Sequence, residues 1–427
     1  MDGLRTVTVL EHEVISVVEA GDALNDVAIA SGASTWLSAA EAKQLLRLNS
    51  LRRGFCQTVS GGVKLSQYCG IVCLGTCVLE VLPKVGMADT QGYAELERSR
   101  GALLTMLHSA REIAITKLAL VPQQAVRAPL LDVFIETFLN CALEQARRGL
   151  LSRYVPHTDD LPVMKGRFHA HGHARHNTGR PHLLRCEYDD FTADNAYNHA
   201  IRATLDACLG WITQASTRRL WFEIRARFAS VSPVRMSAAD VLRLPRDRTT
   251  HRYEPVLTWC EWLLAVVSPA MSAGATNAPG LLFDMNKLFE AHVCRLEERA
   301  AGDGYIVLRQ GPALGLATSG GEAAFMLRPD VSIWHSGQVA SAPDIVRVVD
   351  AKWKRLDPRG PNWLIDQGDV YQMVAYALRY NCQRVELVYP ALSLYGDENI
   401  ALPVFVVANP RPEKESIQIR IRTVPLW

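Results

Sequence analysis

Asp350 and Lys352 are the residues of this sequence with the clearest capacity for chemistry, and they close the apolar run 345–349. That run is typical of a buried strand, in which successive side chains point to opposite faces of a sheet. The carboxylate of Asp350 and the ammonium of Lys352 therefore share one face. This geometry puts an acid and a base side by side at the end of a strand.

A second carboxylate, Asp330, follows Arg328-Pro329 twenty residues before Asp350. We predict a strand over residues 326–334, and a hairpin through the region of Gly337 would bring Asp330 beside Asp350. Two clustered carboxylates repel each other unless a cation joins them, and hard oxygen ligands favour Mg²⁺, for which Mn²⁺ can substitute. These residues predict a metal-dependent phosphodiesterase site.

Lys352 has two possible roles beside such a metal. It could orient or help deprotonate a metal-bound water, or it could stabilise negative charge on a phosphate. The simpler alternative is a surface hairpin in which Asp and Lys form a salt bridge worth only ~0–1 kcal/mol. The helices predicted on either side favour the catalytic interpretation.

The upstream helix is expected from residue 284 onward, with Met285, Leu288, Phe289 and Leu296 as its apolar stripe. Glu290 borders this stripe, close enough to the core to supply a further ligand to the metal or the water.

The downstream helix is expected around residues 369–376, where Asp369, Gln372 and Tyr376 lie on one face. Polar groups on an inward face need partners. A scissile phosphate or an active-site carboxylate would provide them.

The order of these four elements resembles the PD-(D/E)xK nuclease superfamily, in the branch of the RecB and Cas4 nucleases. Within it, four segments are similar to the McrC family, the nuclease subunits of McrBC modification-dependent (5-methylcytosine) restriction systems. The same resemblance extends through the N-terminal half. The nuclease segments are 284–290, 327–330, 350–354 and 369–373, and the others are 68–72, 79–85, 136–139, 148–150, 165–167 and 188–191.

The resemblance implies a Mg²⁺-dependent DNA endonuclease in a complex that cuts double-stranded, modified DNA. It implies that Asp330 and Asp350 hold the metal, that Glu290 completes or orients the site, and that Lys352 acts on the attacking water. Gln372 and Tyr376 would support the metal site or the DNA backbone.

The sequence contains no Gly-x4-Gly-Lys-Ser/Thr motif, so we expect this chain to bind no nucleotide itself. The resemblance supplies a motor in trans, an McrB-like AAA+ GTPase hexamer whose GTP hydrolysis this family stimulates. Residues before about 270 should include the surface that contacts the ring. Two alternatives stay open, a non-catalytic scaffold or activator of such a ring and a self-sufficient RecB-like exonuclease.

The length of 427 residues exceeds one ordinary core, so two or three domains are expected in a mixed α/β (α+β) multidomain protein. We predict a β-rich N-terminal domain over 1–90 and a mainly helical region over 91–270, which bind the AAA+ partner together. A PD-(D/E)xK nuclease domain with a mixed sheet flanked by helices should occupy 271–427. Residues 268–280, rich in small and helix-breaking residues, are the best linker candidate.

The charge balance, 46 basic against 44 acidic residues, gives a net charge of only +2. A surface that binds DNA must therefore be local, and residues 243–248 are the best candidate. No secretion signal or membrane span is predicted, since Glu261 interrupts the apolar stretch 259–267. We expect a cytoplasmic protein.

Two clusters of metal-binding residue types lie outside these motifs. Cys69, Cys73 and Cys77 would share a strand face, but they lack tight Cys-x2-Cys spacing and are expected to be reduced core residues. Residues 169–176 hold four histidines within a stretch, rich in His, Gly and Pro, that we predict to be irregular. On a strand, His169, His171 and His173 would share a face able to hold Zn²⁺, and an exposed polar strand near DNA or a partner is the alternative.

Overall fold

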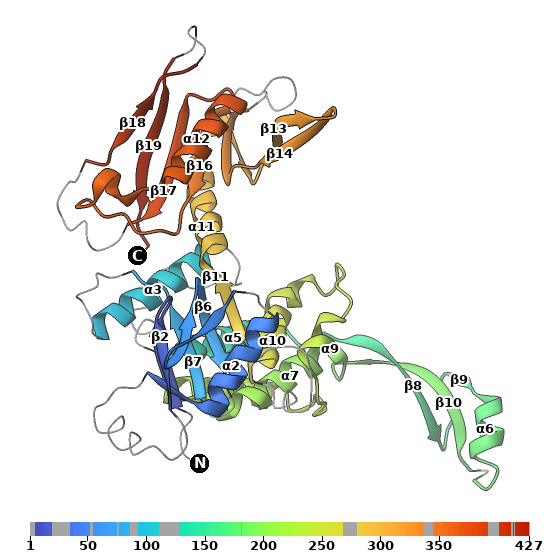
Figure 1. Ribbon diagram of the computed structural model, residues 1–427. Helices are drawn as coiled ribbons and strands as arrows, with labels where there is room; N and C mark the ends of the chain where they lie inside the picture. Colours follow the sequence, from blue (N-terminus) through green and yellow to red (C-terminus); the bar gives the residue numbers. More distant parts are fainter. Residues whose placement is uncertain are drawn as a thin grey trace. The chain divides into compact units, whose positions relative to one another are not determined.

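The structure is a computed structural model of a mixed α/β protein with several separate sheets (Figure 1). It describes residues 5–18, 35–51, 54–74, 77–85, 93–110, 128–180, 182–267, 280–336, 345–391, 401–410, 413 and 415–426. The predicted linker, apart from Gly280, and the hairpin turn around Gly337 lie outside these residues. No helix in the described ranges is long and apolar enough to cross a membrane.

Contacts divide the chain into two compact units that do not follow sequence order. The first comprises Met1–Leu4, Val72–Thr76 and Pro129–Leu281, and the second comprises Arg5–Ile71, Cys77–Ala128 and Leu282–Trp427. The division into domains at residues 90 and 270 stays a prediction.

The N-terminal residues of the second unit form two small sheets. One has the order β1-β7-β6-β11, in which β1 (Arg5–Leu10) and β7 (Cys77–Leu82) run parallel beside β6 (Tyr68–Cys73) and β11 (Gly280–Asp284). The other has the order β3-β2-β5-β4 and carries α2 (Ala39–Leu51). Its strands are β2 (Val14–Val18), β3 (Trp36–Ser38), β4 (Cys56–Val59) and β5 (Gly62–Leu65).

Every residue of β7 is buried, which is typical of a strand covered on both faces. Its one charged residue, Glu80, is therefore paired. Arg100 of α3 (Tyr93–Ala110) donates to both Glu80 oxygens, at 2.9 and 2.7 Å.

The first unit is a helical bundle with a long projection. Its helices are α5 (Leu130–Arg147), α7 (Ala196–Cys208), α8 (Ala215–Arg227), α9 (Ala238–Leu242) and α10 (Glu254–Val267). Trp259 of α10 is fully buried and lies 5.7 Å from the ring of Phe134. The apolar periodicity of these segments had predicted helices, because helices must bury such a face to be stable.

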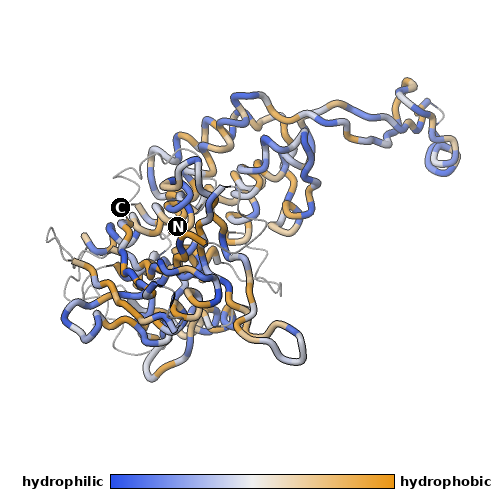
Figure 2. The backbone as a smooth tube through the Cα atoms, turned by 90° about the horizontal axis from the view of Figure 1, so that it is seen from above, coloured by the Kyte–Doolittle hydropathy of each residue, from blue (hydrophilic) through white to orange (hydrophobic). Residues whose placement is uncertain are grey.

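The projection, which we call the arm, consists of β8 (Arg153–Leu161), β9 (Arg167–Phe168), α6 (Ala170–His176) and β10 (Leu184–Thr192). It extends away from the helices of its unit (Figure 1), and Figure 2 shows hydrophilic residues at its tip. The prediction of an irregular segment was wrong here. β8 and β10 pair over nine residues each, and cross-strand ring contacts such as Tyr154 with Phe191, at 5.1 Å, stabilise them.

The histidine cluster at the tip of the arm is helical, so the predicted strand was wrong. His169 caps α6 and accepts the backbone N–H of His173 at 2.8 Å. In a helix, side chains two residues apart do not share a face, so the side chain of His171 does not lie on the same face as those of His169 and His173.

The C-terminal part of the second unit contains a six-stranded mixed sheet of order β12-β15-β16-β17-β19-β18. β15 (Val331–His335) and β16 (Ile345–Ala351) are antiparallel, whereas β16, β17 (Arg384–Pro390) and β19 (Ile417–Val424) are parallel. The edge strands are β12 (Tyr305–Arg309) and β18 (Val404–Val407). The first residues of β19 alternate between buried and exposed positions, so one face of this strand packs against the core.

Two helices cover this sheet. The core beneath α12 (Gln367–Arg379) contains Met373, Tyr376, Ala377 and Tyr380 together with Val348, Val385, Leu387, Ile419 and Ile421 of the strands. α11 (Met285–Ala300) lies on the opposite face, where its Glu297 pairs with Arg347 and Arg422. Glu386 joins the same two arginines at 3.1 and 3.2 Å, so buried acids on this face are neutralised.

The single strand predicted over residues 326–334 is two strands. β14 (Glu322–Leu327) pairs with β13 (Leu314–Ser319) in a separate ribbon, and β15 begins only at Val331. Pro329 explains the break, because it has no backbone N–H and restricts the residue before it. Asp330 consequently lies at the start of a strand.

Candidate active site

Asp330 and Asp350 meet where two inner strands of the six-stranded sheet end, directly before β15 and within the last residues of β16. Val331 pairs with Val349, and the Asp330 carboxylate accepts the backbone N–H of Ala351 at 2.9 Å. Asp350 is 1% exposed. Asp330 is half-buried, so the pair lies between the protein interior and solvent.

Burial and mutual repulsion perturb these acids. Burial, followed by the charges of Asp350 and Glu290, raises the pKa of Asp330 to about 8. Burial also raises the pKa of Asp350, although Lys352 opposes the shift. The two raised pKa values indicate that the positive charge near Asp330 and Asp350 does not balance their negative charge when both carboxyl groups are ionised.

Lys352 lies within this acidic group. Its Nζ is 2.6 Å from an Asp350 oxygen and 3.7 Å from Asp369, and it donates to Gln372 Oε1 at 2.9 Å. Burial alone would lower the pKa of Lys352, but the neighbouring carboxylates, Asp350 first, raise it. An ammonium held in this way is suited to stabilising or orienting negative charge rather than to accepting a proton.

Gln372 and Tyr376 extend the site along α12. Gln372 Nε2 donates to the Tyr376 hydroxyl at 2.8 Å, which in turn donates to the Arg328 carbonyl at 3.0 Å. The chain of contacts runs from Lys352 to the residues just before Asp330. The two residues predicted to share a helix face thus hold both strands of the site in place.

Glu290 lies on α11, and its charge acts on both Asp330 and Asp350. It is half-buried and accepts a hydrogen bond from Gln310 Nε2 at 3.2 Å. Burial raises the pKa of Glu290, and the charge of Asp350 contributes to the shift. Glu290 is therefore coupled electrostatically to the site.

Some neighbours of the site could not be found from sequence spacing. Lys354 donates to the buried Asp369 at 2.7 Å, which helps to hold the helix start against the end of β16. Gln310, the partner of Glu290, follows a strand whose sequence carries no polar motif.

The oxygen donors of the site, the carboxylates of Asp330 and Asp350, suit a hard cation such as Mg²⁺. Within the described parts of the chain, no group of three or more His, Cys, Asp or Glu side chains is arranged to hold a metal ion. Mg²⁺, however, keeps several waters and is commonly bound through one or two carboxylates plus substrate phosphates. The Asp330 and Asp350 pair fits that requirement, because its raised pKa values show two acids without sufficient positive charge.

The other predicted clusters do not form comparable sites. Cys69, Cys73 and Cys77 are buried core residues. His169 lies 3.5 Å from Glu187 at the tip of the arm, which is an ion-pair geometry only if the ring is protonated. In the basic segment 243–248, Arg243 already pairs with Asp240 at 3.4 Å.

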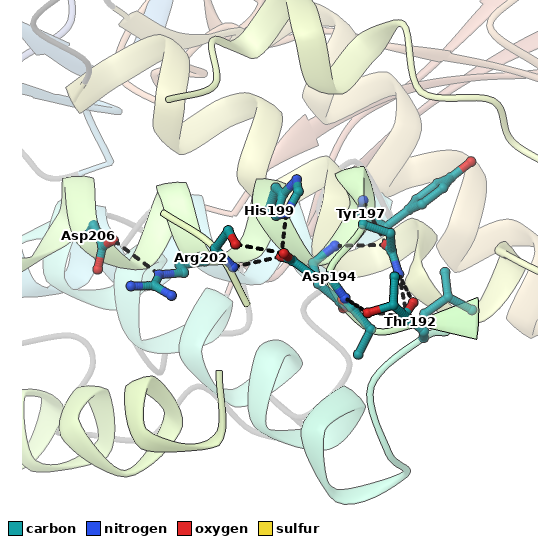
Figure 3. Close-up of polar contacts among 11 residues, drawn as sticks. Thr192, Asp194, Tyr197, His199, Arg202 and Asp206 are labelled. Carbon is teal, nitrogen blue, oxygen red and sulfur yellow. Dashed lines mark hydrogen bonds and ion pairs between the residues drawn. The ribbon is translucent and has the colours of Figure 1, made fainter. Parts of the chain in front are cut away.

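Asp194 and His199 belong to a polar cluster at the base of the arm (Figure 3). The cluster also includes a serine, but its side chains are arranged to hold the structure together and not to carry out a reaction. Asp194 contacts His199 Nε2 at 2.6 Å and accepts from the Ser232 hydroxyl at 2.6 Å. Burial opposes ionisation of Asp194, but the bonds from Ser232 and His199 lower its pKa to about 2. Serine and histidine both bind the acid, so this arrangement fixes a loop instead of activating a nucleophile.

The fold and the site define a class of protein, a mixed α/β protein with paired carboxylates and a lysine at the ends of inner strands of a sheet. Comparison with known proteins identifies the family. The model of the family described as "McrBC 5-methylcytosine restriction system component" matches residues 63–390, and this chain belongs to that family. The resemblance to McrC seen in the sequence is thereby confirmed.

One solved structure shares this fold, and a second was also matched. One chain of the Thermococcus gammatolerans assembly of McrB AAA+ hexamers with bound McrC matches with a TM-score of 0.66 and 19% identity, covering 98% of this chain and 94% of that one. A chain of the McrBC complex from the same organism matches with a TM-score of 0.47 and 21% identity, covering 70% and 88%. No curated protein matches significantly.

Proposed function

We propose that this chain is the Mg²⁺-dependent endodeoxyribonuclease subunit of an McrBC-like restriction complex. The observation that carries the proposal is the pairing of half-buried Asp330 with buried Asp350, with Lys352 Nζ 2.6 Å from Asp350. Membership of the McrBC family supports a role in restriction. The helices on both faces of the sheet support a PD-(D/E)xK nuclease domain.

Each residue of the site has a role in this proposal. Asp330 and Asp350 would hold Mg²⁺, and Glu290 would complete or orient its surroundings. When bound, the metal polarises a phosphate oxygen as a Lewis acid. Lys352 stabilises charge on the phosphate and orients the attacking water, while Gln372 fixes the Lys352 ammonium and Tyr376 fixes Gln372.

The partner in this proposal is an McrB-like AAA+ GTPase hexamer, as in the solved assembly similar to this chain. The arm offers a surface for it, because four large apolar side chains are exposed there. Tyr154 is 72%, Phe191 63%, Val163 73% and Met164 60% exposed. Exposed apolar residues of this size on one projection are typical of a protein contact.

The substrate in this proposal is modified double-stranded DNA, which the complex would cut in the cytoplasm. The choice of modified base is assigned to the partner. A scaffold that only activates the ring is the second candidate, and the exposed residues of the arm would serve that role equally well.

Lys352→Ala separates the two candidates. Losing a charged donor from the reaction centre should slow DNA cleavage by on the order of a hundredfold or more, whereas GTP turnover by the assembled ring should not change. Lys287→Ala, which removes an exposed lysine of α11, is the matched control. Thermal denaturation checks that Lys352→Ala is folded, and unchanged cleavage by a folded variant would favour the scaffold.

A further inference from the structure

Trp353 connects the proposed active site to a distant part of the sequence. It directly follows Lys352, whose backbone N–H donates to Val388 at 2.8 Å in the last rung of the sheet. The indole ring lies 5.4 Å from the ring of Phe289, the residue before Glu290. Trp353 therefore contacts the immediate surroundings of both the strand and the helix that carry site residues.

The indole N–H of Trp353 is held by Glu11. It donates to the two Glu11 oxygens at 2.9 and 3.2 Å, across 342 residues of sequence. Glu11 follows β1, and its own backbone N–H donates to Leu82 of β7 at 2.8 Å. Both residues belong to the second compact unit.

Glu11 is itself firmly fixed. It is 2% exposed, and one of its oxygens also accepts the backbone N–H of Lys84 at 3.0 Å. Burial raises the pKa of Glu11 to about 7, against the hydrogen bonds from Lys84 and Trp353. Burying a carboxylate is costly, and the hydrogen bonds that Glu11 accepts offset only part of that cost. We therefore do not regard its contact with Trp353 as incidental.

We infer that Glu11 is a positioning residue, which fixes the end of β16 bearing Asp350 and Lys352 to the N-terminal sheet through the indole of Trp353. A shift of about 1 Å in a reacting group can slow an enzyme a hundredfold, so such a tether matters for rate. Through this contact, a displacement of β1 or β7 would also displace the residues of the site. The inference rests on the proposed nuclease function.

The kinetic test uses the full chain assembled with its AAA+ GTPase. Glu11→Ala and Trp353→Phe should each lower kcat for DNA cleavage by about tenfold to a hundredfold with little change in KM. Glu11→Gln, whose amide oxygen still accepts the indole N–H, should restore most of the rate. The double variant should be no slower than either single variant, because both remove the same contact.

Glu13→Ala is the matched control from the same turn, since the Glu13 carboxylate binds the backbone N–H of Leu10 at 2.9 Å instead. This variant should cut DNA at the wild-type rate. A wild-type rate for Glu11→Ala, or losses that multiply in the double variant, would overturn the inference.

A second readout does not depend on cleavage. In protein labelled with 5-fluorotryptophan, the ¹⁹F resonance lost in Trp353→Phe identifies this residue. That resonance should shift with pH near 7 in the wild type and should not in Glu11→Gln. Lys84, His12 and Cys69 also face Glu11, and Glu11→Gln retains all three, so it isolates the Glu11 contribution.

The two readouts distinguish failure of the inference from failure of the nuclease assignment. If the wild-type complex cuts no DNA, the nuclease assignment fails, and the tether is judged by the resonance alone. It then stands if Glu11→Ala displaces the Trp353 signal, and it falls if the signal stays in place.

Discussion

At the scale of single residues, the site contains more negative charge than the protein itself neutralises. Lys352 pairs closely with Asp350, while Asp330 accepts a backbone N–H and retains a pKa of about 8. Because this pKa is raised from 3.8 to about 8, the fold loses stability as pH rises between these two values, where Asp330 ionises in the unfolded chain but not in the folded one. The cluster is thus strained electrostatically in the state without metal.

Asp330→Asn should relieve that repulsion while keeping an oxygen that accepts the N–H of Ala351. We expect its free energy of unfolding at pH 9 to exceed that of the wild type by on the order of 1 kcal/mol, with a smaller gain at pH 6. Mg²⁺ should raise the Tm of the wild type more than that of the variant. Urea and thermal denaturation at both pH values measure these differences, and a variant less stable than wild type at pH 9 would refute them.

At the scale of elements, the arm depends on a buried polar network at its base. Asn198, fully buried in α7, donates to the carbonyls of Leu151 and Ala193 at 2.9 and 2.6 Å. Its oxygen accepts the hydroxyl of Tyr253 at 2.9 Å, and that hydroxyl accepts the N–H of Leu151. The residues just before β8 and just after β10 are therefore tied to the helices.

Asn198→Ala should lower the free energy of unfolding by about 2–4 kcal/mol, because it leaves several buried polar groups without partners. Hydrogen exchange should also accelerate in β8 and β10. Asn140→Ala, which removes an exposed amide from α5, is the control. Equal stabilities for the two variants would show that the base of the arm is not held in this way.

Periodicity predicted the elements that bury one regular face. In the predicted apolar stripe of α11, Met285, Leu288 and Phe289 are buried, because the helix has a single way to bury its apolar side. Leu296, the fourth residue of that stripe, is only partly buried. The arm was missed because its strands pair with each other and contain mainly polar residues. The predicted hairpin placed Asp330 beside Asp350, whereas no local pattern could pair Glu11 with Trp353.

At the scale of the whole molecule, the net charge of +2 fits a chain whose function is local rather than a general affinity for DNA. The first unit carries the arm and the second carries the acidic site. We propose that the arm serves assembly with a GTPase ring and that the acidic site cuts DNA.

Replacing residues 154–191 by a short turn tests this assignment. Arg153 and Thr192 are paired at the base of the arm, so a turn can join them without disturbing the helices. We expect the shortened chain to fold but to lose stimulation of GTP turnover by at least about tenfold, as measured with the purified GTPase. Full stimulation would place the ring contact elsewhere.

The central claim is that the Asp330 and Asp350 pair forms a nuclease centre. The most direct measurement compares Mg²⁺-dependent cleavage of modified DNA by the wild-type chain and by Asp350→Ala, each assembled with the GTPase. Asp303→Ala, an exposed acid in the turn after α11, serves as the control. The account predicts normal assembly and GTP turnover for Asp350→Ala with cleavage reduced on the order of a thousandfold. Cleavage by Asp350→Ala at the wild-type rate would contradict it.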